Sequence, residues 1–210
     1  MEEMDWANLN KYKEENRKIS SQLFDENRIV FFGDSITEQW LEIVPDFFLK
    51  NNYINRGIGG QTTPQMLIRF RNDVIKLNPS VVHILAGTND IAGNTGPTTL
   101  DMILDNIISM VELAKVNNIK VLLSSVLPVY DYPWAPGLNP AKKIVELNKM
   151  INKYAKENSI SYINYYLKMV DNHGGLKQEY TTDGVHLTKI GYERIMIPMV
   201  KKSLKKISNN

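Results

Sequence analysis

The sequence predicts an α/β fold with three layers, in which helices cover both faces of a five-stranded parallel sheet. Short apolar runs alternate along the chain with longer segments whose apolar residues recur at helical spacing. Two of the runs, 81–86 and 120–126, consist mainly of Val, Ile and Leu, which is typical of strands that are buried on both faces. The five strands are therefore expected at residues 28–32, 53–55, 81–86, 120–126 and 161–164.

Helix start signals stand between the expected strands. Thr63 is followed by Pro64, and we expect this threonine to cap a helix that has a proline in its first turn. Thr98 and Asp101 have the spacing of a capping box, and the residues after them carry apolar side chains on one helical stripe. Two further helices are expected at about 141–157 and 188–205.

The domain organisation follows from the length. The 210 residues fit one domain, and no linker, repeat or low-complexity stretch divides them. We therefore expect a single domain over residues 1–210. Residues 1–25 are expected to form a helical segment packed on its outside, with Trp6, Leu9 and Tyr12 as its apolar side.

The composition excludes several classes of function. A formal net charge of +2 is too small to indicate a nucleic-acid surface, and the absence of cysteine excludes disulfides, a thiol nucleophile and zinc–thiolate sites. No apolar run approaches the roughly 20 residues of a membrane span. The acidic N-terminus lacks the layout of a secretory signal, so we expect a cytoplasmic protein, although a signal removed earlier would leave no trace here. A homodimer is compatible with the sequence, which does not determine the oligomeric state.

Two glycine-containing clusters follow the first two expected strands, where ligand sites form in open α/β sheets. Ser35, in Gly33-Asp34-Ser35, would lie at the sheet edge with its N–H at the start of a helix, which favours an oxyanion. Taken alone, the tripeptide is equally typical of a turn. The second cluster, 57–62, contains three glycines; a phosphate loop and a structural turn are both open, although its spacing matches neither common phosphate motif.

Two further clusters supply side chains suited to acyl transfer. Asn89 follows the third strand, and its amide could donate to a developing negative charge or simply cap a helix. Asp183 and His186 are three residues apart, so the carboxylate can orient the imidazole and leave its other nitrogen free to act as a base. His83 is expected in the core, and His173 in an exposed loop. Together the four clusters indicate a nucleophilic acyl-transfer site.

These four clusters, in this order, resemble the conserved blocks of the SGNH/GDSL hydrolase family over about residues 28–191. The resemblance implies a flavodoxin-like three-layer fold and an esterase without metal or organic cofactor. It also implies Ser35, Asp183 and His186 as catalytic residues, and Ser35, Gly60 and Asn89 as the oxyanion hole. The stretch Asn55-Arg56-Gly57-Ile58-Gly59-Gly60 is most similar to the branch of platelet-activating-factor acetylhydrolase-type enzymes and bacterial carbohydrate deacetylases.

Substrate choice is expected to depend on the segment 128–137, which is rich in proline and aromatic residues. Tyr130 and Trp134 could stack on a sugar ring or could fold the loop onto the domain. Asp34 joins them as a substrate-binding candidate, although a hydrogen bond within the turn is its simpler role. A short acyl group such as acetyl is favoured because no large apolar lid is evident. The expected substrate is a small-molecule ester, an O-acetylated carbohydrate or a lysolipid. The alternatives are a lysophospholipase or thioesterase, a non-catalytic α/β module, and a nucleotide-binding domain.

Overall fold

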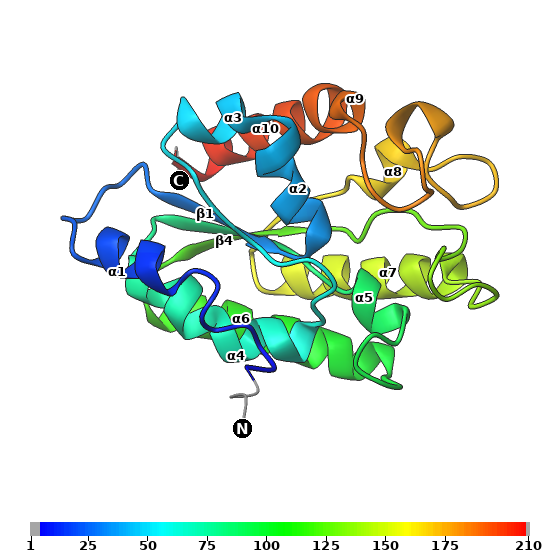
Figure 1. The fold of residues 1–210 in the computed structure, drawn as a ribbon, viewed down its shortest axis with the longest axis horizontal. Helices are drawn as coiled ribbons and strands as arrows, with labels where there is room; N and C mark the ends of the chain where they lie inside the picture. Colours follow the sequence, from blue (N-terminus) through cyan, green and yellow to red (C-terminus); the bar gives the residue numbers. More distant parts are fainter. Residues whose placement is uncertain (1–4, 209–210) are drawn as a thin grey trace.

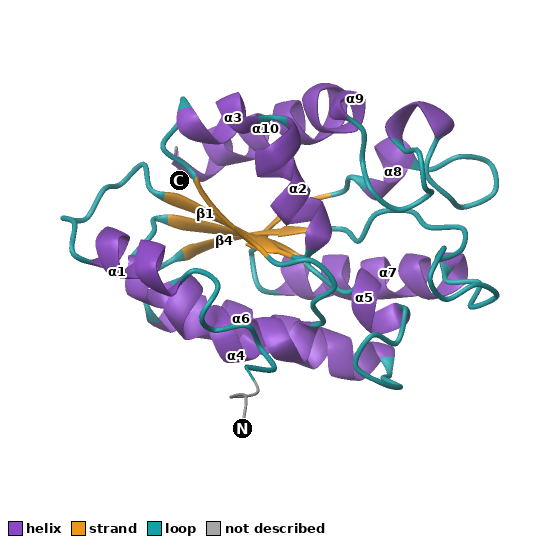
Figure 2. Cartoon of the chain, viewed as in Figure 1, coloured by secondary structure: helices purple, strands orange, loops and turns teal. Residues whose placement is uncertain are grey.

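The computed structural model describes residues 5–208 and confirms the predicted fold class. A parallel sheet of five strands lies between two layers of helices (Figures 1 and 2). The strand order is β2-β1-β3-β4-β5. The chain forms β1 first and then β2 at one edge of the sheet, returns past β1 to form β3, and adds β4 and β5 toward the other edge. The strands are β1 (Ile29–Gly33), β2 (Ile54–Gly57), β3 (Val81–Leu85), β4 (Lys120–Ser124) and β5 (Ser161–Ile163).

Alternate residues of each strand enter different halves of the core. In β1, Ile29 and Phe31 face one layer of helices, whereas Val30 and Phe32 face the other, and all four are buried. This two-sided burial explains the nearly continuous apolar runs in the sequence. The helical segments are α1 (Lys13–Ser20), α2 (Ser35–Ile43), α3 (Pro45–Leu49), α4 (Thr63–Asp73), η1 (Ile75–Leu77), α5 (Thr88–Ile91), α6 (Leu100–Val116), α7 (Ala141–Glu157), α8 (Tyr166–Met169), η2 (Gln178–Tyr180), α9 (Lys189–Gly191), η3 (Tyr192–Met196) and α10 (Ile197–Ser208).

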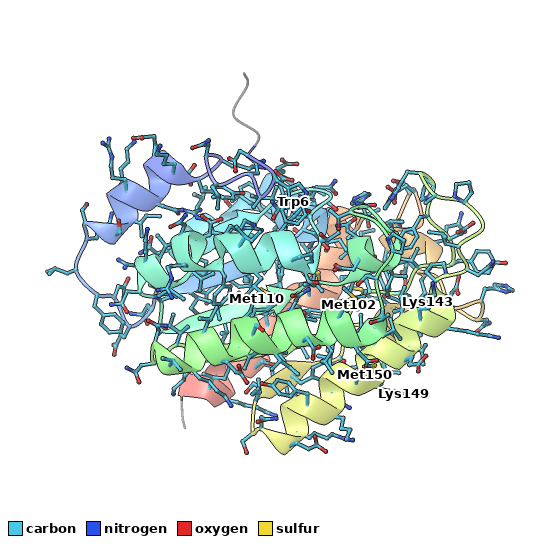
Figure 3. The ribbon with its side chains drawn as sticks, turned by 90° about the horizontal axis from the view of Figure 1, so that it is seen from below. Trp6, Met102, Met110, Lys143, Lys149 and Met150 are labelled. Carbon is cyan, nitrogen blue, oxygen red and sulfur yellow. The ribbon has the colours of Figure 1, made fainter. Side chains whose placement is uncertain are left out.

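Each face of the sheet has its own layer. Helices α4, α6 and α7 lie side by side on one face, which Figure 3 views from outside, and Met110 of α6 is fully buried there. On the other face Trp40 of α2 stacks between Phe47 and Tyr192, with ring centroids 5.1 and 5.5 Å away. None of the helices in the described part of the chain has the length and apolar character of a membrane span.

Two of the helix starts lie one residue away from the predicted positions. Thr62, not Thr63, is the N-cap of α4, and the Gln65 side chain accepts a hydrogen bond from its N–H at 3.0 Å. Thr63 is already helical because its N–H and hydroxyl both donate to the carboxylate of Asp90. Thr99, not Thr98, caps α6. The predicted helix at 141–157 coincides with α7, and the last helix runs through α9, η3 and α10.

The N-terminal segment differs more from its prediction. The helix α1 covers only Lys13–Ser20, because the Asp5 carboxylate accepts the N–H groups of the following turn and Asn8 has a left-handed backbone with φ 55°. Trp6 is 52% exposed, so it is not part of an apolar helix face. Tyr12 instead donates its hydroxyl to the carbonyl of Gly57, at the end of β2. Residues 1–4 of the predicted segment lie outside the described residues.

Candidate active site

Ser35 is placed at the carboxyl edge of the sheet by the turn between β1 and α2. Gly33 ends the strand where no side chain fits, since a Cβ there would lie 2.1 Å from the hydroxyl of Thr37 and 2.8 Å from the carbonyl oxygen of Leu85. Asp34 follows as the N-cap of α2 and accepts the N–H of Ile36 at 3.0 Å. Ser35 is thus the first residue of α2, where the free N–H groups of the helix favour a negative charge.

The turn before α9 brings Asp183 and His186 to this serine. The Nε2 atom of His186 lies 3.0 Å from the Oγ of Ser35, and its Nδ1 atom lies 2.6 Å from Oδ2 of Asp183. Because an ionised carboxylate only accepts, Nδ1 carries a proton, and Nε2 of the neutral ring accepts the serine hydroxyl. The three residues therefore form one hydrogen-bonded chain across 151 residues of sequence.

The electrostatics of the turn keep the carboxylate ionised. Partial burial acts to raise the pKa of Asp183, but hydrogen bonds from the His186 ring and from the N–H groups of Val185 and His186 lower that pKa to about 2. The Oδ1 atom accepts those two N–H groups at 2.9 and 2.8 Å, and the hydroxyl of Thr181 at 3.2 Å. A carboxylate held in this way can stabilise a protonated imidazole.

The two remaining clusters also come to this edge. The carbonyl of Gly33 accepts the N–H of Ile58. This bond holds the glycine loop, residues 57–62, against the end of β1. Gly60 has φ +74°, a left-handed conformation suited to glycine. Asn89, only 2% exposed, donates one N–H of its amide to the carbonyl of Gln61 at 3.0 Å. Within residues 5–208 the other N–H of this amide makes no hydrogen bond, so it can donate to a ligand.

The structure corrects the prediction that Asp34 binds substrate. Its side chain is 1% exposed and is committed to capping α2, and burial raises its pKa to about 7. Burial likewise raises the pKa of Asp90. The carboxyl of Asp90 accepts the N–H and the hydroxyl of Thr63 and so anchors the start of α4. Both acids are structural neighbours of the site, because a substrate cannot reach a carboxylate enclosed by the fold.

The aromatic segment is only partly at the site. Trp134 lies beside His186, with ring centroids 6.3 Å apart and planes inclined at 34°, and is 46% exposed. Tyr132 is fully buried and donates its hydroxyl to the carbonyl of Thr88, which anchors the segment. Tyr130 is 60% exposed and packs against Gly175, where an added Cβ would come within 3.0 Å of the Cβ of Tyr130.

The other histidines are separate from this arrangement. His83 is fully buried, shares a hydrogen bond of 3.2 Å with Tyr165, and burial lowers its pKa to about 3. His173 is exposed in the loop before Gly174. Within residues 5–208 no group of three or more His, Asp or Glu side chains is placed to hold a metal ion.

One residue of the site carried no signal in the sequence. Asn94, in the loop between α5 and α6, donates to the carbonyl of Gly60 and to the side chain of Asn89, and accepts from Trp134. A single asparagine in a loop has no spacing that marks it, and only the fold brings it between these partners.

The comparisons with known proteins agree with this geometry. The family model described as GDSL-like Lipase/Acylhydrolase matches residues 31–194. The chain belongs to this family. It is accordingly an ester-bond hydrolase, and the predicted resemblance is confirmed.

Solved and curated relatives cover most of the chain. A GDSL-like lipase from Bacteroides thetaiotaomicron is 48% identical, with a TM-score of 0.93 over 97% of this chain and 100% of that one. An acetyl xylan esterase is 25% identical, with a TM-score of 0.66 over 83% of this chain and 98% of that one. Platelet-activating factor acetylhydrolase IB subunit alpha2 of Rattus norvegicus is 26% identical over 194 residues, or 88% of this chain and 79% of that protein. The match to the lipoprotein YqeF of Bacillus subtilis, 30% identical over 120 residues, spans only 49% of that protein's length.

Proposed function

We propose that this acylhydrolase is a serine esterase that cleaves short-acyl carboxylic esters, above all acetyl esters, through an acyl-enzyme. The observation that carries the proposal is the unbroken hydrogen-bonded chain from Asp183 through His186 to Ser35, with distances of 2.6 and 3.0 Å. A serine hydroxyl becomes an effective nucleophile when a positioned base accepts its proton as it attacks.

The reaction follows from the two ring nitrogens of His186. Nε2 takes the proton of Ser35 while Oγ bonds to the ester carbonyl carbon, whose oxygen becomes an anion. When the tetrahedral intermediate collapses, the bond to the alcohol breaks and the alcohol leaves with the proton from Nε2. Water then attacks the acyl-serine by the same steps and releases the carboxylic acid and free Ser35. Asp183 stays ionised throughout and stabilises the imidazolium.

The oxyanion would be held by three donors. These are the backbone N–H groups of Ser35 and Gly60 and the free amide N–H of Asn89. The N–H of Ser35 belongs to the first turn of α2, so it has no helical acceptor of its own. Loss of one such donor typically costs about 3 kcal/mol in the transition state, or about a hundredfold in rate.

An O-acetylated carbohydrate is the substrate class that we propose. The exposed indole of Trp134 beside His186 offers a flat apolar face to a sugar ring at the point where the alcohol would leave. Two relatives support the acetyl group, since one is named an acetyl xylan esterase and another an acetylhydrolase.

The test is hydrolysis of p-nitrophenyl acetate, butyrate and octanoate, with acetate release from acetylated xylo-oligosaccharides measured in parallel. Ser35→Ala should abolish turnover of every ester. Ser109→Ala on α6, a serine whose hydroxyl donates to the carbonyl of Asp105, is the matched control and should keep full activity. Turnover that survives Ser35→Ala would refute the serine mechanism. Faster cleavage of octanoate than of acetate would refute the short-acyl preference and favour a lysophospholipase.

A further inference from the structure

Asn94 occupies the junction of three parts of the proposed site. Its Nδ2 atom lies 3.0 Å from the carbonyl oxygen of Gly60 and 3.0 Å from Oδ1 of Asn89, and its Oδ1 atom lies 3.2 Å from Nε1 of Trp134. Its backbone N–H also donates to the carbonyl of Asn89. The exposed side chain of Asn94 thus contacts Gly60, Asn89 and Trp134 at once.

The chemistry of these partners determines which way each amide faces. The indole N–H of Trp134 can only donate, and the carbonyl of Gly60 can only accept. Asn94 must therefore turn its oxygen toward Trp134 and its NH₂ toward Gly60. The second proton of that NH₂ then faces Asn89, which can meet it only with its own carbonyl oxygen.

The orientation of Asn89 is held by two partners, because the carbonyl of Gln61 can only accept and the NH₂ of Asn94 can only donate. With its oxygen held by Asn94, the amide of Asn89 places its NH₂ toward the carbonyl of Gln61, and one N–H stays free for a ligand. Rotated by 180°, the same amide would aim an oxygen at the developing oxyanion. A donor would be lost and a repulsive acceptor would replace it.

We propose that Asn94 is a positioning residue which, oriented by the indole of Trp134, holds Asn89 with its amide N–H toward the oxyanion. This inference rests on the proposed function, in which Asn89 is an oxyanion donor. Asn94 itself touches no reacting atom. The role of Trp134 is thereby twofold, because the ring lies beside His186 and its N–H sets the direction of the amide chain.

Asn94→Asp is the sharpest perturbation of this chain. The variant has the same shape, but a carboxylate oxygen would face the oxygens of Gly60 and Asn89, and Asn89 would rotate to offer its NH₂ to that carboxylate. We expect kcat for p-nitrophenyl acetate to fall about a hundredfold, the effect typical of one lost oxyanion donor, with KM changed less than threefold. Thr95→Ala is the control from the same loop; its hydroxyl contacts Thr62 and not Asn89, so kcat should stay near the wild-type value.

The deciding measurement is a double-mutant cycle with Asn89→Ala. If Asn94 acts through Asn89, Asn94→Asp will lower kcat less than threefold when Asn89 is already alanine. A hundredfold loss in both backgrounds would overturn the proposal, as would a kcat of Asn94→Asp within twofold of wild type.

Trp134→Phe tests the same chain without altering the loop. It keeps an aromatic ring beside His186 but removes the indole N–H together with one ring of the indole. We expect kcat to fall about fivefold, the effect of roughly one neutral hydrogen bond, with the same dependence on Asn89. An undiminished kcat would overturn the assigned role of the indole. Failure of the proposed function would be recognised separately, because Ser35→Ala alone tests it. The double-mutant cycle is therefore evaluated on the part of the activity that Ser35→Ala abolishes.

Discussion

Asp183→Asn is the substitution whose effect follows most directly from the geometry. The two oxygens of this carboxylate have unequal partners among residues 5–208, since Oδ1 accepts three donors and Oδ2 accepts the ring N–H of His186 alone. An asparagine has one oxygen. At about 1 kcal/mol for each hydrogen bond, placing that oxygen at the Oδ1 position is favoured by about 2 kcal/mol, or roughly 30-fold.

This preference puts the asparagine NH₂ against Nδ1 of His186. The ring must then accept at Nδ1 and carry its proton on Nε2, where it can no longer take the proton of Ser35. Loss of the negative charge beside the imidazolium removes a further 1.5 to 3 kcal/mol, the range for a hydrogen bond to a charged group, or about 10- to 150-fold. Together we expect kcat to fall roughly 10³-fold, while the melting temperature changes little because the Oδ1 contacts persist.

The assay is kcat for p-nitrophenyl acetate together with the ¹⁵N chemical shifts of the His186 ring. In Asp183→Asn these shifts should show the proton on Nε2. Asp183→Ala is the matched control: it loses the three turn contacts and stability, but leaves the ring free to choose its tautomer. Each folded molecule of that variant should therefore be more active than Asp183→Asn. A kcat for Asp183→Asn above one tenth of wild type, or an alanine variant less active than it, would refute the reasoning.

The remaining predictions concern stability and its dependence on pH. Burial raises the pKa of Asp34 from 3.8 to about 7, so between these values the folded protein keeps a proton that the unfolded chain has lost, and its stability falls as the pH rises. The stability of Asp34→Asn relative to wild type should increase by up to about 1.4 kcal/mol per pH unit between pH 4 and 7, measured by urea unfolding; a constant difference would contradict this. Arg69→Met leaves Asp73 as an unpaired buried charge and should cost about 3 to 5 kcal/mol in the same assay, whereas a cost below 1 kcal/mol would show that the pair does not matter. Gly57→Ala places a Cβ 2.1 Å from the backbone nitrogen of Glu38, so we expect about 3 kcal/mol of destabilisation, and a loss below 1 kcal/mol would show that α2 can move aside.

Features that depend on local pattern were predictable from the sequence. The apolar runs predicted the strands to within two residues at every end, and the helix at 141–157 was predicted without error. The polar clusters were expected at the carboxyl edge of the sheet because parallel strands end together there. The structure brings Ser35, Asn89, Asp183 and His186 to that edge, although their roles in catalysis stay a proposal.

Features that depend on tertiary contacts were not predictable in this way. The cap of α4 shifted by one residue because Asp90, from another element, takes the N–H of Thr63. Tyr12 was expected on the apolar side of a helix, but its hydroxyl bonds to the carbonyl of Gly57, 45 residues away at the end of β2. Asn94 was missed because its three partners come from separate parts of the chain, the loop after β2, helix α5 and the segment 128–137.

The same distinction explains why the site depends on the whole fold. Arg69, fully buried on α4, donates to the carbonyl of Gly33 at 2.8 Å, to the carbonyl of Arg56 at 3.0 Å and to the side chain of Gln61. These acceptors belong to the ends of β1 and β2 and to the glycine loop, which are the segments that place Ser35 and Gly60. One guanidinium thus joins both strand ends to the loop through acceptors that are buried in the fold. The charge of Arg69 is balanced by Asp73. Loss of this buried ion pair would therefore change both the stability of the sheet edge and the geometry of the loop that contains Gly60.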